Sequence, residues 1–345
     1  SIDVTVGKMV HLGGSAGYII SIFDIVLAVL YLLWVLEIAS DKSIRVRFYP
    51  KISVPAILLI GIAAVSAAFA RIPDLSIFEI VEILKMYLCF LYIANNLRDE
   101  RDLRFIITML IVGLFLEGVL GFGQRRYGEP IWPTSLGGPH RIESRVTGTW
   151  VSYNDFSWYL TFILPLTFSL LFSNVKLYYK YVCGIIIAFG TASLMWTNSR
   201  SGWISFAVAV IFIFTFAFGN IKGKWAFMKA VMSMMLITVL LTPLYPRLSD
   251  KLLLRFVGDD RGSAESRLPQ FEVALKIIED NYLIGVGLNN YTSIMKEYDT
   301  TKEGLESITL YAVHNIFLHI AAEIGIFGFI VFLWILIAIF LEGMR

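Results

Sequence analysis

Long apolar runs separated by short polar segments dominate the chain. A membrane-spanning helix needs about 20 mostly apolar residues, and nine segments approach or reach that length. These predicted spans are residues 17–36, 52–70, 77–97, 103–122, 151–173, 178–196, 201–219, 226–244 and 324–342. The third is the least apolar, because Glu79, Glu82 and Lys85 crowd its beginning. The pattern predicts an all-α, multi-pass membrane bundle.

The connections between the runs divide the chain into three parts. Residues 123–150 and 245–310 form two long connections, and the others are short, as in a helical bundle. We therefore predict an N-terminal transmembrane bundle of about eight spans over residues 1–244. A loop domain follows over residues 245–312, and residues 313–345 supply a re-entry segment and the final span.

The basic residues orient the predicted bundle. The loops after spans one, three, five and seven hold twelve Lys and Arg residues, and the alternate loops of comparable length hold six. Cytoplasmic loops carry the excess of Lys and Arg, so the first set is predicted to be cytoplasmic. The 245–310 loop and residue 1 then lie on the outer face. Because no initiator Met is present, we expect a longer protein with at least one further helix before residue 1.

Composition excludes several classes of protein. The chain is 57% hydrophobic and 16% charged, against about 45–50% and about 25% in soluble domains. This excludes a cytosolic enzyme, a nucleic-acid binder and a disordered chain. The formal charge of +2 gives no attraction for a polyanionic partner. Cys89 and Cys183 lie in apolar runs and the four histidines are scattered, so neither a disulfide framework nor a metal site is predicted.

Charged residues inside predicted spans are functional candidates, because burying a charge in the bilayer is costly. They are Asp24, Glu82, Lys85, Glu117 and Asp155. Glu82 and Lys85 are three residues apart and can pair on one helix face. Asp24 and Glu117 are interpreted as isolated charges without an assigned role.

Two arginines on the predicted outer face are candidates for binding an anion. Arg200 lies in a tight turn flanked by Ser and Gly, which suits a positioned anion site, although an interfacial Arg can also extend to lipid headgroups. Arg267 precedes a predicted amphipathic helix, in which Phe271, Ala274, Leu275 and Ile278 follow helical spacing after Pro269. Free N–H groups at such a helix start and a guanidinium favour an anion. The alternative is an ion pair with Glu265.

Three further features of the outer segments have competing interpretations. His314 begins the last apolar stretch, and a histidine can act as a general base near neutral pH, or simply cap a helix. Asp259 and Asp260, between glycines, could suggest a metal site but are more typical of a solvated turn. Residues 285–287, Gly-Val-Gly, are too short for a phosphate loop and are predicted to form a turn.

Four short elements occur in an order that resembles a known family. They are Arg145-x-x-Gly148 with Asn154; Ser199-Arg200-x-x-Trp203; Ser266-Arg267 with Ala274-Leu275 and Gly285-x-Gly287; and His314-Asn315 with Glu323-x-Gly325-x-x-Gly328. Each is weak alone. Together, on a multi-span chain, they make roughly residues 105–340 resemble the bacterial O-antigen ligase and O-antigen polymerase superfamily.

The resemblance implies a GT-C-type helical fold with a large periplasmic loop, and a metal-independent, inverting glycosyltransferase without a cofactor. Such an enzyme moves a glycan from undecaprenyl diphosphate to an acceptor hydroxyl at the periplasmic face of the bacterial inner membrane. The acceptor is lipid A-core in a ligase and another lipid-linked glycan in a polymerase. His314 is the implied general base. The implied substrate-binding residues are Arg200, Arg267, Arg145, Asn154 and Asn315, with the first two contacting the diphosphate.

A second class of function remains open at the level of sequence. A transporter or flippase for a lipid-linked glycan would share this composition and substrate. Transporters are typically built from inverted repeats with polar groups near the bilayer midplane. Here the distinctive residues gather at one predicted membrane face beside a long loop, and this favours glycan transfer.

Overall fold

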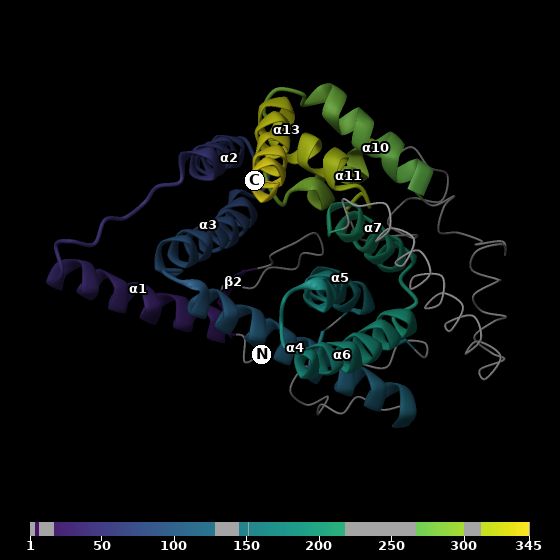
Figure 1. The fold of residues 1–345 in the computed structure, drawn as a ribbon. Coiled ribbons are helices and arrows are strands. Elements are labelled where there is room, and N and C mark those ends of the chain that lie inside the picture. Colours follow the sequence, from purple (N-terminus) through teal and green to yellow (C-terminus); the bar gives the residue numbers. More distant parts are fainter. Residues whose placement is uncertain are drawn as a thin grey trace. The chain divides into compact units, whose positions relative to one another are not determined.

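The computed structural model of the chain is almost entirely helical where it is described (Figure 1). The described residues are 4–6, 17–127, 145–150, 152–217, 267–299 and 312–344. Within them the strands are β1 (Val4–Val6) and β2 (Tyr18–Ile20), which pair antiparallel with Val4 opposite Ile20. The predicted all-α class is confirmed.

Six of the described helices are long and apolar enough to cross a membrane. They are α1 (Ile22–Ser40), α2 (Pro50–Ala68), α4 (Glu100–Tyr127), α5 with its following 3₁₀ turn (Tyr153–Phe172), α6 (Leu177–Trp196) and α13 (Ile316–Gly343). The prediction of a multi-pass membrane protein is therefore confirmed.

The other three predicted spans have different outcomes. The span at 77–97 forms helix α3 (Pro73–Asn96), which is long enough but not among the six apolar helices. The span at 201–219 corresponds to α7 (Arg200–Ala217). The span predicted at 226–244 lies outside the described residues.

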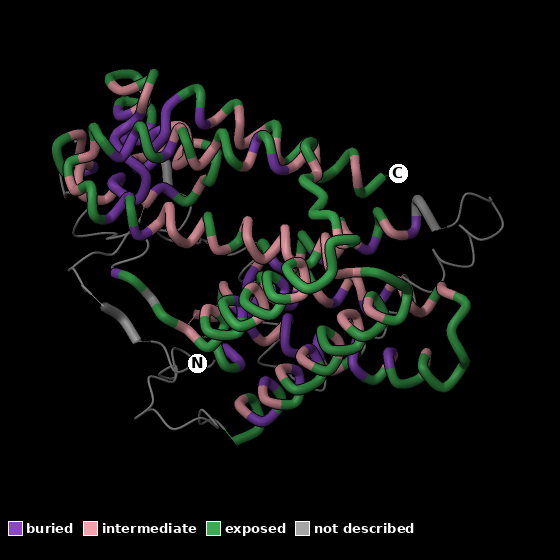
Figure 2. Tube along the Cα trace, turned by 90° about the vertical axis from the view of Figure 1, so that its left-hand side faces the viewer, coloured by how far each residue is buried: buried purple, intermediate pink, exposed green. Residues whose placement is uncertain are grey.

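The outer surfaces of the long helices suit a lipid environment. Most of their residues are exposed or intermediate (Figure 2), and only 11% of the α1 window and 33% of the α5 and α6 windows are buried. Many of the exposed side chains are large and apolar, such as Leu32, Leu116 and Ile337. In a bilayer these side chains contact lipid hydrocarbon, so their exposure does not carry the free-energy cost of apolar surface in water.

The chain forms two compact units, which we describe separately. The first unit consists of Ser1–Leu97 and Leu254–Arg345, and the second consists of Arg98–Leu253. The 267–299 segment therefore belongs to the same unit as the first three helices. The predicted division into a bundle, a loop domain and a re-entry segment stays a prediction.

In the first unit, α2 runs antiparallel along α13 and also packs on α3. Lys51 Nζ lies 2.6 Å from Glu342 Oε1 at one end of the α2–α13 pair. Near the other end, Ser66 Oγ donates to the backbone carbonyl of Glu323 at 2.8 Å. Helices α10 (Arg267–Asp280) and α11 (Tyr291–Tyr298) lie against α13 (Figure 1). The part of the predicted loop that is described is thus ordered and helical.

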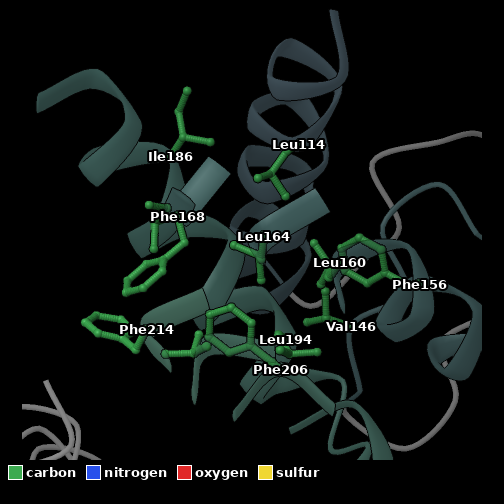
Figure 3. Packing of buried hydrophobic residues seen from close by; sticks show 12 residues of the cluster. Leu114, Val146, Phe156, Leu160, Leu164, Phe168, Ile186, Leu194, Phe206 and Phe214 are labelled. Atoms are coloured by element: carbon green, nitrogen blue, oxygen red, sulfur yellow. The ribbon is translucent and has the colours of Figure 1, made fainter. Parts of the chain in front are cut away.

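The second unit packs α4, α5, α6 and α7 around one apolar core. Leu114, Phe156, Leu160 and Leu164 are fully buried, with Leu194 beside them (Figure 3). Small residues let the helices approach closely. A Cβ on Gly190 would lie 2.8 Å from Leu164 Cδ2.

Candidate functional site

His314 lies exposed just before α13, in contact with a buried glutamine. Its ring Nδ1 is 3.0 Å from Gln270 Oε1, and its backbone N–H donates to the same oxygen at 3.4 Å. Gln270 is only 4% exposed. A backbone N–H can only donate, so the oxygen is the acceptor and Nδ1 carries the ring hydrogen. In the neutral ring Nε2 is then the nitrogen able to accept a proton.

Asn315, predicted to bind substrate, is the N-cap of α13. Its Oδ1 accepts hydrogen bonds from the backbone N–H groups of Phe317 at 3.0 Å and Leu318 at 3.2 Å. Asn is a preferred N-cap because its side chain satisfies N–H groups that the helix leaves unpaired. The cap orients the start of α13 directly after His314, a role that the sequence analysis missed.

The second histidine of this segment, His319, contacts a buried carboxylate. Its Nε2 is 3.1 Å from Glu323 Oε1, one helical turn further along α13. The same oxygen accepts a hydrogen bond from the backbone N–H of Tyr291 at 3.1 Å. Burial, with a contribution from the Glu323 charge, raises the pKa of the Tyr291 hydroxyl. His319 is thus part of the packing between α11 and α13, whereas His314 is exposed.

The segment at 285–287 forms the turn that we predicted, and it docks against a break in α13. The backbone N–H groups of Val286 and Gly287 donate to the carbonyls of Ala322 and Glu323 at 3.0 and 2.9 Å. At Gly325 the helix breaks, with φ 67° and ψ −172°. A Cβ on Gly285 would overlap the Glu323 carbonyl, and one on Gly325 would overlap the Leu283 carbonyl. Gly285 and Gly325 are therefore required by one backbone-to-backbone contact.

In the second unit, two side chains of α4 hold the 145–150 turn. Glu117 accepts hydrogen bonds from the hydroxyl of Thr149 and, at 3.1 Å, from its backbone N–H. Gln124 Oε1 accepts from the N–H groups of Thr147 and Gly148 at 3.1 and 2.9 Å. Glu117, interpreted from sequence as an isolated charge, is thus a structural ligand of this turn. Its spacing of seven residues from Gln124 puts both on one face of α4.

Gly148 has a left-handed backbone, with φ 57°. A Cβ there would overlap the Glu117 carboxylate and lie 2.8 Å from the Phe156 ring. The glycine in the Arg145-x-x-Gly148 element therefore permits the close approach of α4 and α5 at this turn.

Arg145 and Arg200 belong to the same end of the second unit. The Arg145 guanidinium lies 4.2 Å from the centre of the Tyr153 ring, in a cation–π contact. The next residue, Val146, donates its backbone N–H to the carbonyl of Trp196 at 3.2 Å, where α6 ends. Arg200 follows as the first residue of α7 and is partly buried.

A short turn between α6 and α7 sets the position of Arg200. Asn198 has φ 55°, and Ser199 donates its backbone N–H to Thr197 Oγ1 at 3.2 Å. Trp203 Nε1 donates to the carbonyl of Leu194 at 3.0 Å, which links the two helices. The tight turn predicted from sequence is present. Asn154, also predicted to bind substrate, is exposed in the first turn of α5.

The amphipathic helix predicted after Pro269 is confirmed as α10, which begins at Arg267. Its buried face differs from the predicted one. Val273, Ala274 and Ile277 are buried, whereas Leu275 is 55% exposed. The side chain of Arg267 and residues Asp259 and Asp260 lie outside the described residues. Arg267 and Arg200 belong to different units, so their predicted convergence stays a prediction.

The predicted Glu82–Lys85 pair is confirmed, with a separation of 2.6 Å. Asp24 is not isolated: its Oδ1 is 3.0 Å from Lys85 Nζ, and its other oxygen accepts from Ser21 at the start of α1. This cluster links α1 to α3. Within the described ranges, no group of three or more His, Cys, Asp or Glu could hold a metal ion.

Comparison with known proteins gives one positive result. Residues 185–333 match the model of a family described as O-antigen ligase. No curated protein and no solved structure matches the chain significantly. The matched region contains Arg200, Arg267 and His314, while Arg145 and Asn154 precede it. It confirms the resemblance to the O-antigen ligase and polymerase superfamily.

Proposed function

We propose that this chain, whose residues 185–333 match the O-antigen ligase family, transfers a glycan from undecaprenyl diphosphate to an acceptor hydroxyl. At family level it is an O-antigen ligase-like or polymerase-like membrane glycosyltransferase. The finer proposal is that the donor and the acceptor meet at the periplasmic face of the bacterial inner membrane. The acceptor is lipid A-core or another lipid-linked glycan, and no cofactor takes part.

The observation that carries the proposal is the hydrogen bond from Nδ1 of the exposed His314 ring to the side chain of the buried Gln270. In the reaction, Nε2 accepts the proton of the acceptor hydroxyl as its oxygen attacks the anomeric carbon. The bond from that carbon to the diphosphate oxygen breaks, and its electron pair leaves with the diphosphate. Attack opposite the leaving group inverts the anomeric centre. One positioned base is sufficient for this step.

The arginines are proposed to stabilise the leaving group. Arg200 and Arg267 bind the diphosphate, and Arg145 supplies a third positive charge nearby. A guanidinium offers two parallel N–H donors to a phosphate, and fixed donors aimed at developing negative charge lower the barrier. The reaction therefore proceeds without a metal. Asn154 contributes a polar contact to the substrate, and Asn315 acts by fixing the start of α13 beside His314.

The test is transfer by the purified protein in detergent, with an undecaprenyl-diphosphate-linked glycan and each acceptor in turn. Formation of the joined glycan, detected by mass spectrometry, is the expected result. A transporter changes the location of its substrate and not its covalent structure, so it gives no product in detergent. Absence of product with both acceptors, while donor still binds, would overturn the proposal in favour of transport.

A further inference from the structure

The cation–π contact between Arg145 and Tyr153 is a feature of the second unit to which the proposed function assigns no role. The Arg145 guanidinium lies 4.2 Å from the centre of the Tyr153 ring, and both residues are partly buried. Within the described part of the chain, Arg145 forms no ion pair. Arg71 and Arg104, in contrast, are each paired with a glutamate. An aromatic ring attracts a guanidinium without neutralising its charge, so Arg145 keeps its positive charge for an anion.

The backbone on both sides of this contact is fixed by hydrogen bonds. Val146 donates its N–H to the carbonyl of Trp196 at 3.2 Å, and this bond holds the residue after Arg145 at the end of α6. Tyr153 is the first residue of α5, and the side chain of Ser152 is the N-cap of that helix. An arginine side chain is long and flexible. The Tyr153 ring restrains the guanidinium at the end of it.

The face of α5 that carries Tyr153 is also the face that meets the start of α7. Ser157 lies four residues further along α5, and residues with this spacing share one helix face. Ser157 is fully buried, and a Cβ on Gly202 would overlap its hydroxyl oxygen. Gly202 is two residues after Arg200, in the first turn of α7. Tyr153 therefore belongs to the α5 face directed at the helix that begins with Arg200.

The geometry points to Tyr153 as a positioning residue that holds Arg145 for the diphosphate of the donor. This inference rests on the proposed function and deepens it by one residue. Without the ring the guanidinium samples many rotamers, and binding an anion then costs the entropy of fixing it. The ring face is the part of Tyr153 that acts, and its hydroxyl is not required. Lipid headgroups also carry phosphate, so measurements in detergent without phospholipid separate the two sources.

Substitutions of Tyr153 test the inference through donor kinetics. Tyr153→Leu removes the aromatic face, and kcat/KM for the undecaprenyl-diphosphate-linked donor should fall about fivefold, as expected for a partly exposed cation–π contact. Tyr153→Phe keeps the face and should stay within about twofold of wild type. The acceptor KM should not change in either variant. Trp158→Leu is the matched control, because Trp158 is another aromatic residue of α5 and is 60% exposed.

A double variant distinguishes positioning from a general effect on the fold. If Tyr153 acts through Arg145, Tyr153→Leu should cause no further loss of kcat/KM in an Arg145→Ala protein. An equal loss in both backgrounds would show that Tyr153 supports the fold, and would overturn the inference. Two other results would also overturn it: equal losses in Tyr153→Phe and Tyr153→Leu, or no loss in Tyr153→Leu.

Inorganic pyrophosphate tests the same contact without requiring turnover. Calorimetry with the purified full chain in detergent should give a Kd for pyrophosphate that is severalfold weaker in Tyr153→Leu than in wild type. The Kd should be unchanged in Tyr153→Phe and Trp158→Leu. A wild-type protein that binds no pyrophosphate, or a Tyr153→Leu protein that binds it equally well, overturns the inference. Binding that depends on Tyr153 in a protein that never forms product supports the positioning role and contradicts the proposed function.

Discussion

At the scale of single residues, the structure separates two histidines that the sequence places five positions apart. His314 is exposed and held by a neutral amide, whereas His319 contacts the buried carboxylate of Glu323. Because His319 contacts a buried carboxylate, its ring contributes to the packing of α13. His314, by contrast, is exposed just before α13.

The first prediction compares alanine variants of these histidines. His314→Ala should lower turnover by roughly 10²–10⁴-fold, the usual contribution of a general base, while donor binding persists. His319→Ala should keep more activity, because its contact is structural. Transfer is measured at matched amounts of folded protein. An active His314→Ala protein beside a folded but inactive His319→Ala protein would show that the base is assigned to the wrong residue.

The second prediction concerns Gln270, which acts through His314 as a positioning residue. Gln270→Leu removes the acceptor for Nδ1–H, so the ring is no longer held with Nε2 unprotonated, and kcat should fall by about tenfold. Gln270→Glu restores an acceptor but adds a negative charge that favours the protonated ring. Because the base must be neutral, the acid side of the pH–rate profile should then move to higher pH.

The readout for Gln270 is the pH dependence of kcat/KM for both variants. A merely structural role for Gln270 would change the amount of folded protein and leave the profile in place. An unshifted profile in an active Gln270→Glu protein would contradict the positioning role. The chain has only four histidines, so ¹⁵N-histidine NMR can report the ring tautomer separately from transfer.

At the scale of elements, most of the helices could be predicted from the sequence. The length of an apolar run is almost enough to predict a membrane helix. The described spans therefore coincide with the predicted runs to within several residues. The last span differs most. It was predicted from residue 324, but α13 begins at Ile316 and breaks at Gly325. The break depends on docking of residues 285–287, about forty positions away, and hydrophobic periodicity carries no information about that contact.

The third prediction tests this docked break. Gly325→Ala should destabilise the protein by about 1–3 kcal/mol, because φ 67° with ψ −172° is a region that only glycine occupies without strain. The added Cβ would also overlap the Leu283 carbonyl. Gly61→Ala is the control, since its Cβ meets nothing within 4 Å. Thermal unfolding in detergent measures both. Equal midpoints would contradict the requirement for glycine at the break.

At the scale of the whole molecule, the sequence could predict candidate residues but not their structural partners. The Glu82–Lys85 pair was predictable because its partners are three residues apart on one helix. Asp24 and Glu117 were not, because their partners, Lys85 and Thr149, lie 61 and 32 positions away in sequence. Gln270 carried no sequence signal at all, since its role arises only where α10 meets the segment before α13.

The last prediction concerns Arg200 and Arg267, which belong to different compact units. If both bind one diphosphate, the effect of changing one arginine depends on whether the other is present. Arg200→Lys and Arg267→Lys should each lower transfer by about tenfold to a hundredfold, because an ammonium lacks the bidentate fork. Arg104→Lys is the control: Arg104 forms an exposed pair with Glu100 at 2.8 Å on α4.

The double variant shows whether the two arginines share a ligand. Groups that contact one ligand couple, so the double variant should lose less than the product of the two single losses. Independent sites would instead give losses that multiply. Full activity of both single variants would remove the arginines from the mechanism. If the two losses multiply, each arginine contributes to transfer, but the two do not bind a common diphosphate. The leaving group would then be stabilised by residues of one unit alone.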